Sequence, residues 1–266
     1  MRQIPLILIT LTLLPSTSWA QAEPRQSRED AASWNMPPLL YSSDPDYKYP
    51  RWVSASAALD ANGSLNSEYF YPISLRTMRE YLEAPEDHGC ILVEEEYSSF
   101  YAPPDQSTLE KAVAASALIT YAKVTGRDYG FHGSVPGQLV RVEPVETIRQ
   151  RSKNLPEYFV FFPVGTFNVG AKTICKIDRR YAAVPEVGDH LLLLVAEYFH
   201  RDPAEPFIEL GLPGTIITFS QDGKVSLPSA LTDSDTQLAA RRHSPTLAQD
   251  LLQTVRDYAK KARGGQ

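Results

Sequence analysis

The hydrophobic positions of this chain change their spacing several times, and each change predicts a different element. Over residues 75–84 (LRTMREYLEA), apolar side chains recur at helical spacing and predict a short helix bounded by Pro85 and Gly89. The next apolar stretch, residues 90–97 (CILVEEEY), predicts a strand. An α+β portion is therefore expected in this part of the chain.

A helix followed by a strand is predicted immediately downstream. Ser107 stands three residues before Glu110, which is a helix-capping signal, and the helix should cover Thr108 to Ala115. Beyond Ala115 the apolar spacing shortens to two, as in a strand. The two faces of this strand would carry Leu118, Thr120, Ala122 and Val124 on one side and Ile119, Tyr121 and Lys123 on the other.

Further strand patterns follow, with short turns and no helices between them. A turn is expected around Gly133–Gly137, and Asp222-Gly223 predicts a hairpin within residues 214–227. Consecutive strands of this kind favour an antiparallel sheet or barrel, so the expected fold is mainly β with flanking helices. The strands between these turns are predicted at residues 139–148, 157–169, 172–177 and 189–199.

The densest apolar run, Leu191–Val195, decides how the second half of the chain is organised. It is too short to cross a membrane, which takes about 20 apolar residues. It also lacks the polar face of a surface helix. Continuous apolar runs are typical of strands covered on both faces. We therefore predict a central barrel strand over Leu191–Phe199, with one set of side chains in the core and the other covered by a C-terminal helix.

That C-terminal helix is predicted from its cap and its apolar stripe. Ser244 supplies a capping hydroxyl, and Pro245 suits the first helical position. The stripe consists of Leu247, Leu251, Leu252, Val255 and Tyr258. The whole chain then divides into a signal peptide (1–20), a flexible or extended N-terminal segment (21–50), an α+β portion (51–106), an OB-like β-barrel domain (107–228), a linker (229–243) and the C-terminal helix (244–266).

The N-terminus and the charge balance indicate where the protein is located. Arg2, a short apolar core and the small residues before position 21 form the pattern of a secretory signal, with cleavage expected after Ala20. Without Arg2, the 26 basic and 32 acidic residues leave a charge of 25 − 32 = −7. An acidic chain argues against nucleic-acid binding and against electrostatic membrane binding. We expect a secreted or periplasmic protein with no membrane span after cleavage.

Two cysteines, Cys90 and Cys175, are the whole cysteine content. In an oxidising compartment such a pair favours a disulfide bond between them. The alternative is two buried small hydrophobic side chains that never meet. Neither cysteine belongs to a C-x-x-C motif, so a redox motif or a zinc clip is not indicated.

The segment around the second cysteine resembles part of a known protein family. Cys175, a spacer, Val187-Gly188-Asp189 and the aliphatic strand Leu191–Val195 together resemble the netrin-like modules shared with tissue inhibitors of metalloproteinases. The similar region spans about residues 115–200. The resemblance implies a five-stranded OB-type barrel. The expected mature start, QAEPRQ, has no Cys-x-Cys of the kind with which those inhibitors chelate metal, so no inhibitory residue carries over.

No motif for chemistry emerges from the remaining residues. The five histidines show no short metal-ligand spacing; they are His88, His132, His190, His200 and His243. Ser134 does not stand in G-x-S-x-G, because His132 occupies the place of the first glycine. Nucleotide-binding motifs do not occur either. We therefore predict no catalytic, cofactor-binding or metal-binding residue.

Aromatic residues near three consecutive acids form a candidate ligand platform. Its members would be Tyr69, Tyr71, Tyr97, Phe100 and Tyr101, with Glu94 and Glu96. Amphipathic rings suit both a binding face and the edge of a core, so sheet packing explains them as well. Glu94 and Glu96 would share one face of a strand and could serve proton transfer or simply blunt a solvated edge.

These features favour a non-enzymatic binding or interaction module that meets a protein or glycan partner in the envelope or outside the cell. A hydrolase that acts on envelope carbohydrate or peptide through its acids is the alternative. A protease inhibitor is the third possibility.

Overall fold

The computed structural model describes residues 36–42, 46–85, 89, 91–93, 108–150, 155–176, 184–196, 207–209, 216–227 and 247–264. The fold is mainly β, as the sequence predicts. The strands are β1 (Leu39–Leu40), β2 (Trp52–Ser54), β3 (Ile91–Val93), β4 (Ser116–His132), β5 (Val135–Arg149), β6 (Tyr158–Phe162), β7 (Gly165–Val169), β8 (Lys172–Lys176), β9 (His190–Ala196), β10 (Phe207–Glu209), β11 (Ile216–Phe219) and β12 (Val225–Ser226). The helices are α2 (Pro72–Glu83), α3 (Leu109–Ala115) and α5 (Leu247–Gly264).

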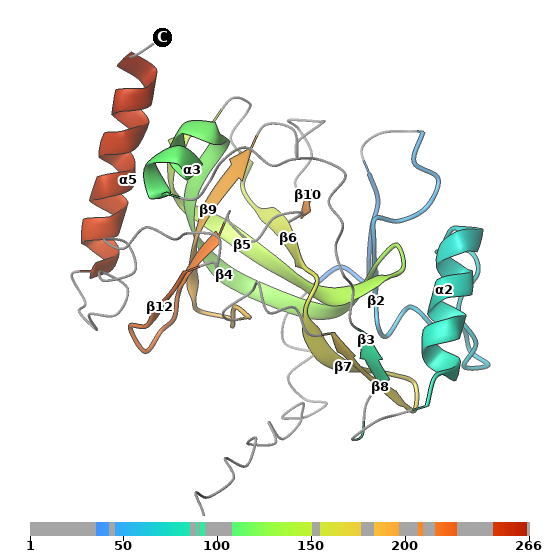
Figure 1. Ribbon diagram of the computed structural model, residues 1–266. Coiled ribbons are helices and arrows are strands. Elements are labelled where there is room, and N and C mark those ends of the chain that lie inside the picture. Colours follow the sequence, from blue (N-terminus) through green and yellow to red (C-terminus); the bar gives the residue numbers. More distant parts are fainter. Residues whose placement is uncertain are drawn as a thin grey trace, which may run out of the picture.

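A long hairpin of β4 and β5 forms the middle of the molecule (Figure 1). The strand order of the main sheet is β10-β6-β5-β4-β9-β11-β12, and β2 joins the far end of β4. The pairings are antiparallel except that of β10 with β6. Among the described strands, β10 and β12 at the ends of this path do not pair, so these pairings form no closed barrel.

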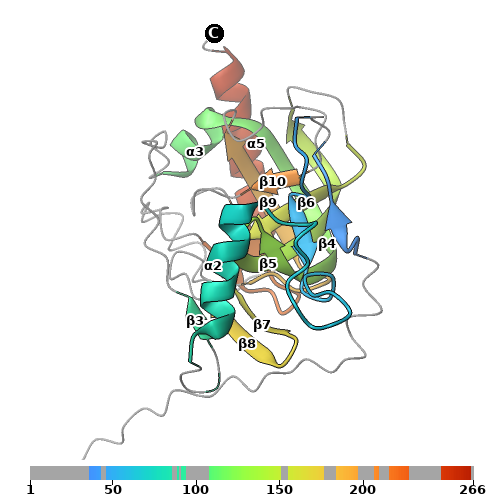
Figure 2. The same cartoon turned by 90° about the vertical axis from the view of Figure 1, so that its right-hand side faces the viewer.

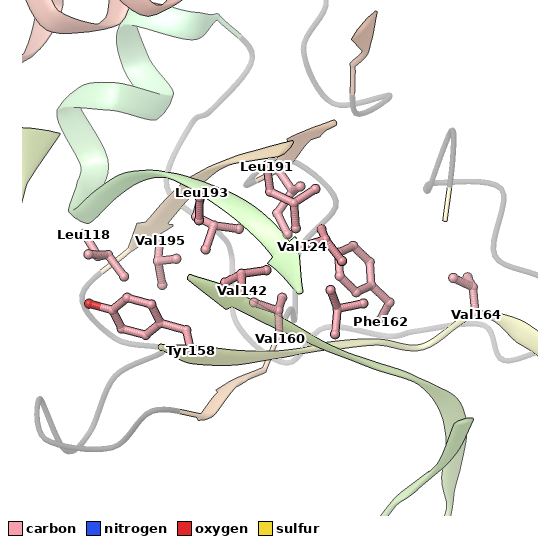
Figure 3. Close-up of a cluster of buried hydrophobic side chains, with 13 residues drawn as sticks. Leu118, Val124, Val142, Tyr158, Val160, Phe162, Val164, Leu191, Leu193 and Val195 are labelled. Atoms are coloured by element: carbon pink, nitrogen blue, oxygen red, sulfur yellow. The ribbon is translucent and has the colours of Figure 1, made fainter. Parts of the chain in front are cut away.

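One apolar core of this sheet lies on one of its faces. Side chains from five strands meet there, and Figure 3 shows the labelled ones gathered between the ribbons. Every second residue of β9 contributes, because strand side chains alternate between faces. The buried members are Leu118, Ala122, Val124, Val140, Val142, Tyr158, Val160, Phe162, Val164, Leu191, Leu193, Val195 and Ile216.

The other face of β9 is covered by helices. Leu192 and Leu194 pack with Leu251, Leu252 and Val255 of α5, and α3 completes this second cluster. The prediction that the apolar run is a strand with one face in the core and the other under the C-terminal helix is confirmed for His190–Ala196. The two predicted faces of β4 are separated in the same way, with Leu118 in the first cluster and Ile119 in the second.

Different elements pack on the sheet at the opposite end of the β4–β5 hairpin. Helix α2 packs on the ends of β2 and β4 together with a small sheet of order β3-β8-β7, and Figure 2 looks onto these elements with α5 at the back. β2 and α2 come from the predicted 51–106 portion. β7 and β8 lie within the predicted 107–228 domain, yet β8 pairs with β3 from the first portion. Strand pairing therefore crosses the expected boundary.

Several predicted bounds are wrong. β5 begins at Val135 rather than Leu139, because the turn after β4 takes only residues 133 and 134. The strand expected over 157–169 is two strands in different sheets, β6 and β7, which are separated at Pro163. Proline has no N–H to donate to a ladder, which favours a break there.

Two helix starts also differ from the sequence prediction. α2 begins at Pro72, whose fixed φ suits the first turn of a helix. α3 is capped by Thr108, whose side chain accepts a hydrogen bond from the backbone N–H of Lys111 at 3.3 Å. The signal peptide (1–20), the linker (229–243), Ser107, and the cap at Ser244 and Pro245 lie outside the described residues.

Candidate functional site

A cleft of about 340 Å³ opens on the outer face of the main sheet, where α5 begins. Its walls come from strands β4, β9, β11 and β12, from the hairpin turn between the last two, and from the first turn of α5. The side chains that define it are Tyr121, His190, Phe219, Gln221, Lys224 and Ala248.

The register of the strands explains why this cleft exists. His190 lies opposite Lys123 of β4 on one side and opposite Phe219 of β11 on the other. The stripe of α5 covers Leu192 and Leu194, which follow along the same face of β9. Ala248 in the first described turn of α5 lines the cleft together with His190 and Phe219, so this row lies beside that turn.

Three rings form the apolar part of the cleft. The Tyr121 and His190 rings are stacked, with centroids 5.1 Å apart and planes 11° apart. Phe219 meets Tyr121 edge-on, at 5.7 Å and 81°. Such offset-stacked and edge-to-face pairs are favoured arrangements of aromatic rings. The cleft therefore has a floor of two stacked rings and a third ring nearly perpendicular to them.

The titratable rings of the floor are uncharged near neutral pH. Burial lowers the pKa of His190 below its usual value, and the nearby Lys123 lowers it further, against an opposite effect of Asp189. Burial raises the pKa of the Tyr121 phenol. Both groups therefore present neutral rings with a polar edge.

The rim opposite the rings is polar, and its charges compensate each other. Lys224 Nζ forms an ion pair with Asp222 Oδ2, and Ser220 Oγ donates to Asp222 Oδ1 at 2.7 Å. The hydrogen bond from Lys224 is the main reason that the pKa of Asp222 is lowered to about 2. The rim thus combines donors and acceptors without a net charge from this pair.

A buried carboxylate fixes the rim to the preceding turn. Asp189 Oδ1 accepts from the backbone N–H of Gln221 at 3.1 Å, and Asp189 Oδ2 accepts from the N–H of Glu186 at 2.9 Å. Gln221 Nε2 donates in turn to the carbonyl oxygen of Val187 at 2.8 Å. These bonds join the chain before β9 to the β11–β12 hairpin, so the cleft is formed in advance of any ligand.

The predicted tyrosine platform is described only in part. Tyr69 is half-buried and packs against the apolar cluster beneath α2, whereas Tyr71 is exposed and its ring centroid lies 4.2 Å from that of Tyr49. The other members, Glu94, Glu96, Tyr97, Phe100 and Tyr101, lie outside the described residues.

Tyr71 belongs to an exposed aromatic surface that the sequence did not indicate as a unit. Arg51 lies over the ring of Tyr47 at 4.9 Å, and Lys48 lies over that of Tyr49 at 5.4 Å. We call residues 47–51 with Tyr71 the tyrosine surface. It lies at the α2 end of the molecule, away from the cleft.

One carboxyl group elsewhere on β4 has a strongly altered acidity. Burial raises the pKa of Asp128 to about 6, although the backbone N–H of Tyr129 donates to its Oδ1 at 2.8 Å. The neighbouring Arg127 faces Glu186 at 3.9 Å. A raised pKa is common at functional sites but also arises from burial alone, and Asp128 does not line the cleft.

Ser134 and His132 lie at the β4–β5 turn, whereas His88, His200 and His243 lie outside the described residues. Ser134 lies in the turn between β4 and β5, and His132 Nδ1 donates to the carbonyl oxygen of Arg51 at 2.6 Å. Cys175 lies on β8 opposite Leu92, and Ile174 lies opposite Ile91. Cys90, which precedes Ile91, is outside the described residues, so the disulfide stays a prediction. Within the described ranges, no group of three or more potential metal ligands occurs.

The three rings of the cleft were not predicted as a group. The sequence pattern places Tyr121 on one face of a strand, and His190 has no metal-ligand spacing. Their meeting depends on the pairing of β4 with β9 and of β9 with β11. No local pattern reports such a register.

No protein-family model matches the chain, and no curated protein is significantly similar to it. Of the helices in the described ranges, none is both long enough and apolar enough to span a bilayer.

Proposed function

We propose that this protein is a secreted or periplasmic binding module that holds its ligand in the cleft beside α5. The observation that carries this proposal is the preformed ring floor of Tyr121, His190 and Phe219 opposite a polar rim. Ligand sites typically combine aromatic walls with a few placed polar groups. The expected signal peptide and the acidic composition support the location.

An OB-type barrel remains part of the proposal. β4 pairs with β5 and β9, β5 with β6, β6 with β10, and β9 with β11. β10 is parallel to β6 and β11 is antiparallel to β9, so the strands at both ends of the series β6-β5-β4-β9 have further partners, which is compatible with a five-stranded Greek-key barrel. This order supports the fold that the netrin-like resemblance implies.

A non-enzymatic role fits the character of the cleft. Its imidazole is stacked against a ring, and Asp222, a carboxylate next to the lining residues Gln221 and Gly223, is held in an ion pair. General acid–base catalysis needs groups whose pKa lies near the working pH. The pKa of Asp222 is lowered far from that range. The alternative hydrolase would depend on Glu94 and Glu96, and it predicts turnover that their substitution abolishes.

The proposal is tested by NMR on the purified, isotope-labelled chain. A set of small ring compounds that are neutral, anionic or cationic is titrated while the ring signals of Tyr121, His190 and Phe219 are followed. We expect at least one compound to shift these signals in a saturable way. The same titration of Tyr41→Leu, an exposed ring that does not line the cleft, serves as the matched control and should give the same shifts. If no compound shifts the cleft signals, the proposal is wrong.

A further inference from the structure

The two walls of the cleft differ in character, and the difference restricts the ligand. One wall consists of the stacked Tyr121 and His190 rings with Phe219 edge-on. The other consists of hydrogen-bonding groups of the β11–β12 turn. A ligand that fits both must present an apolar face and a polar edge, because buried polar groups need hydrogen-bond partners.

The charges of the cleft favour a neutral ligand. Asp222 and Lys224 form an ion pair on the rim, and each moves the pKa of the other toward the charged form. Their charges therefore cancel locally. The lowered pKa of His190 keeps the floor uncharged. An anion or a cation would have to break the rim pair to gain a counter-ion.

The polar groups of the rim retain capacity for further hydrogen bonds. Gln221 Nε2 donates to Val187, but an amide group has two donor hydrogens and an acceptor oxygen. Lys224 Nζ has three donor hydrogens, of which the ion pair uses one, and the carboxylate of Asp222 can accept about four hydrogen bonds, of which Ser220 and Lys224 already supply three. A ligand with several adjacent hydroxyl groups could use donors and acceptors together.

We propose that the cleft binds a neutral sugar ring, a proposal that rests on the binding function of this site. A pyranose has an apolar face of C–H groups and a rim of hydroxyls. The C–H face lies on the outer face of the Tyr121–His190 stack, and the hydroxyls reach Lys224 and Gln221, with Asp222 held beside Lys224. The cleft volume of about 340 Å³ lies at the small end of ligand pockets, which suits one or two rings.

The test uses methyl glycosides of glucose, galactose, mannose and N-acetylglucosamine, with benzoate and benzylamine as anionic and cationic ring controls. NMR titration of the full chain should give saturable shifts of the cleft signals with at least one glycoside. For a ligand of this size we expect a Kd of about 1 mM. Benzoate and benzylamine should bind at least roughly tenfold more weakly, on the scale where 1.4 kcal/mol is a factor of ten.

Variants separate the two walls. Phe219→Leu keeps an apolar side chain but removes the ring, and Lys224→Met with Asp222→Asn removes the rim charges with little change of shape. Each should weaken glycoside binding by about tenfold, the effect of one lost favourable contact of about 1.4 kcal/mol. Tyr41→Leu should leave it unchanged. Thermal unfolding of each variant shows that the fold is retained, and His190→Gln provides a second floor variant if Phe219→Leu does not fold.

The outcomes distinguish the two proposals. Glycoside shifts that the floor and rim variants weaken support the sugar ring. If benzoate or benzylamine shifts the cleft signals and no glycoside does, the sugar proposal is wrong but the binding function stands. If no probe shifts them, both proposals are wrong.

Discussion

The two ends of the β4–β5 hairpin are held by different kinds of interaction. At the α5 end, charged side chains join helices to strands: Arg256 forms a bidentate ion pair with Glu146, at 2.9 and 2.6 Å. Arg149 donates to the carbonyl oxygens of Val113, Ser116 and Ala259. These bonds are directional, so they position α3 and α5 on the sheet.

The α2 end relies instead on ring contacts and close backbone packing. Phe131 meets Phe70 and Phe167 edge-on, with centroids 6.2 and 5.7 Å apart. Gly130 packs so closely on β2 that an added Cβ would lie within van der Waals radii of Val53 O. The cleft therefore lies at the end where charged contacts hold a helix on the sheet. At the α2 end, aromatic side chains pack against one another.

The largest expected effect comes from the cysteine pair. Replacing both Cys90 and Cys175 with Ser should destabilise the protein by about 4 kcal/mol, since the disulfide would close a long loop. The α2 end should unfold first, because β8 belongs to the small sheet there. Denaturant unfolding of the double variant measures the loss, and a thiol count on the denatured, unreduced chain gives an independent check. Two reactive thiols would refute the disulfide.

Gly130→Ala should damage the same end by steric overlap. The new Cβ would stand 2.1 Å from Val53 O, so β2 must move away from β4. We expect a loss of roughly 3 kcal/mol, typical of overpacking in a tight core. Gly63→Ala is the matched control: its φ is +78°, but nothing lies within 4 Å of the added Cβ, so only about 1 kcal/mol of backbone strain is expected. Equal losses in both variants would contradict the steric argument.

Asp128 should make the protein less stable as the pH rises. Its pKa of about 6 in the folded state exceeds the ordinary value of 3.8, so its proton is held more tightly after folding. This contribution is full below about pH 4 and is lost as the pH rises through 6. Asp128→Asn should therefore gain about 2 kcal/mol at pH 7 and little at pH 3.5, after allowance for partial solvation. A gain that is independent of pH would contradict this assignment.

Arg149→Met tests the α5 end. It leaves the carbonyl oxygens of Val113, Ser116 and Ala259 without this donor, and an unsatisfied partly buried acceptor costs about 1–3 kcal/mol. We expect a loss of about 2 kcal/mol in denaturant unfolding and faster amide exchange in α5. Arg149→Lys keeps the charge but not the forked guanidinium group, so its free energy of unfolding should fall by less than that of Arg149→Met. If the two variants are equally unstable, the fork geometry is unimportant.

Glu146→Gln should have the smallest effect and the opposite pH dependence to Asp128. The hydrogen bond from Arg256 lowers the pKa of Glu146, so this contribution is present above its ordinary pKa of 4.5 and is lost as the pH falls through the folded value. Both side chains are more than a third exposed, which limits the loss at pH 7 to about 1 kcal/mol. Stability curves of the wild type and the variant should converge in acid; a constant gap would contradict the ion pair as the cause.

The sequence predicted elements well where a pattern lies within one segment. The apolar alternation of β4, the apolar run of β9 and the apolar stripe of α5 each indicate which side chains are covered. The periods of strands and helices decide directly on which face a residue lies. The β11–β12 hairpin followed from Asp222-Gly223 for the same local reason. The break at Pro163 and the start of α2 at Pro72 had signals too, but these competed with longer apolar patterns.

The contacts between distant segments follow from the packing of the whole chain and not from a local pattern. The sequence alone determined that the chain is mainly β, that β9 is covered on both faces and that the last helix is amphipathic. The meeting of Tyr121, His190 and Phe219 depends on strand register, and the cleft beside them depends on where α5 begins on the sheet. Register and helix placement are set by packing over the whole molecule, because a shift of one residue would turn each of these rings to the other face.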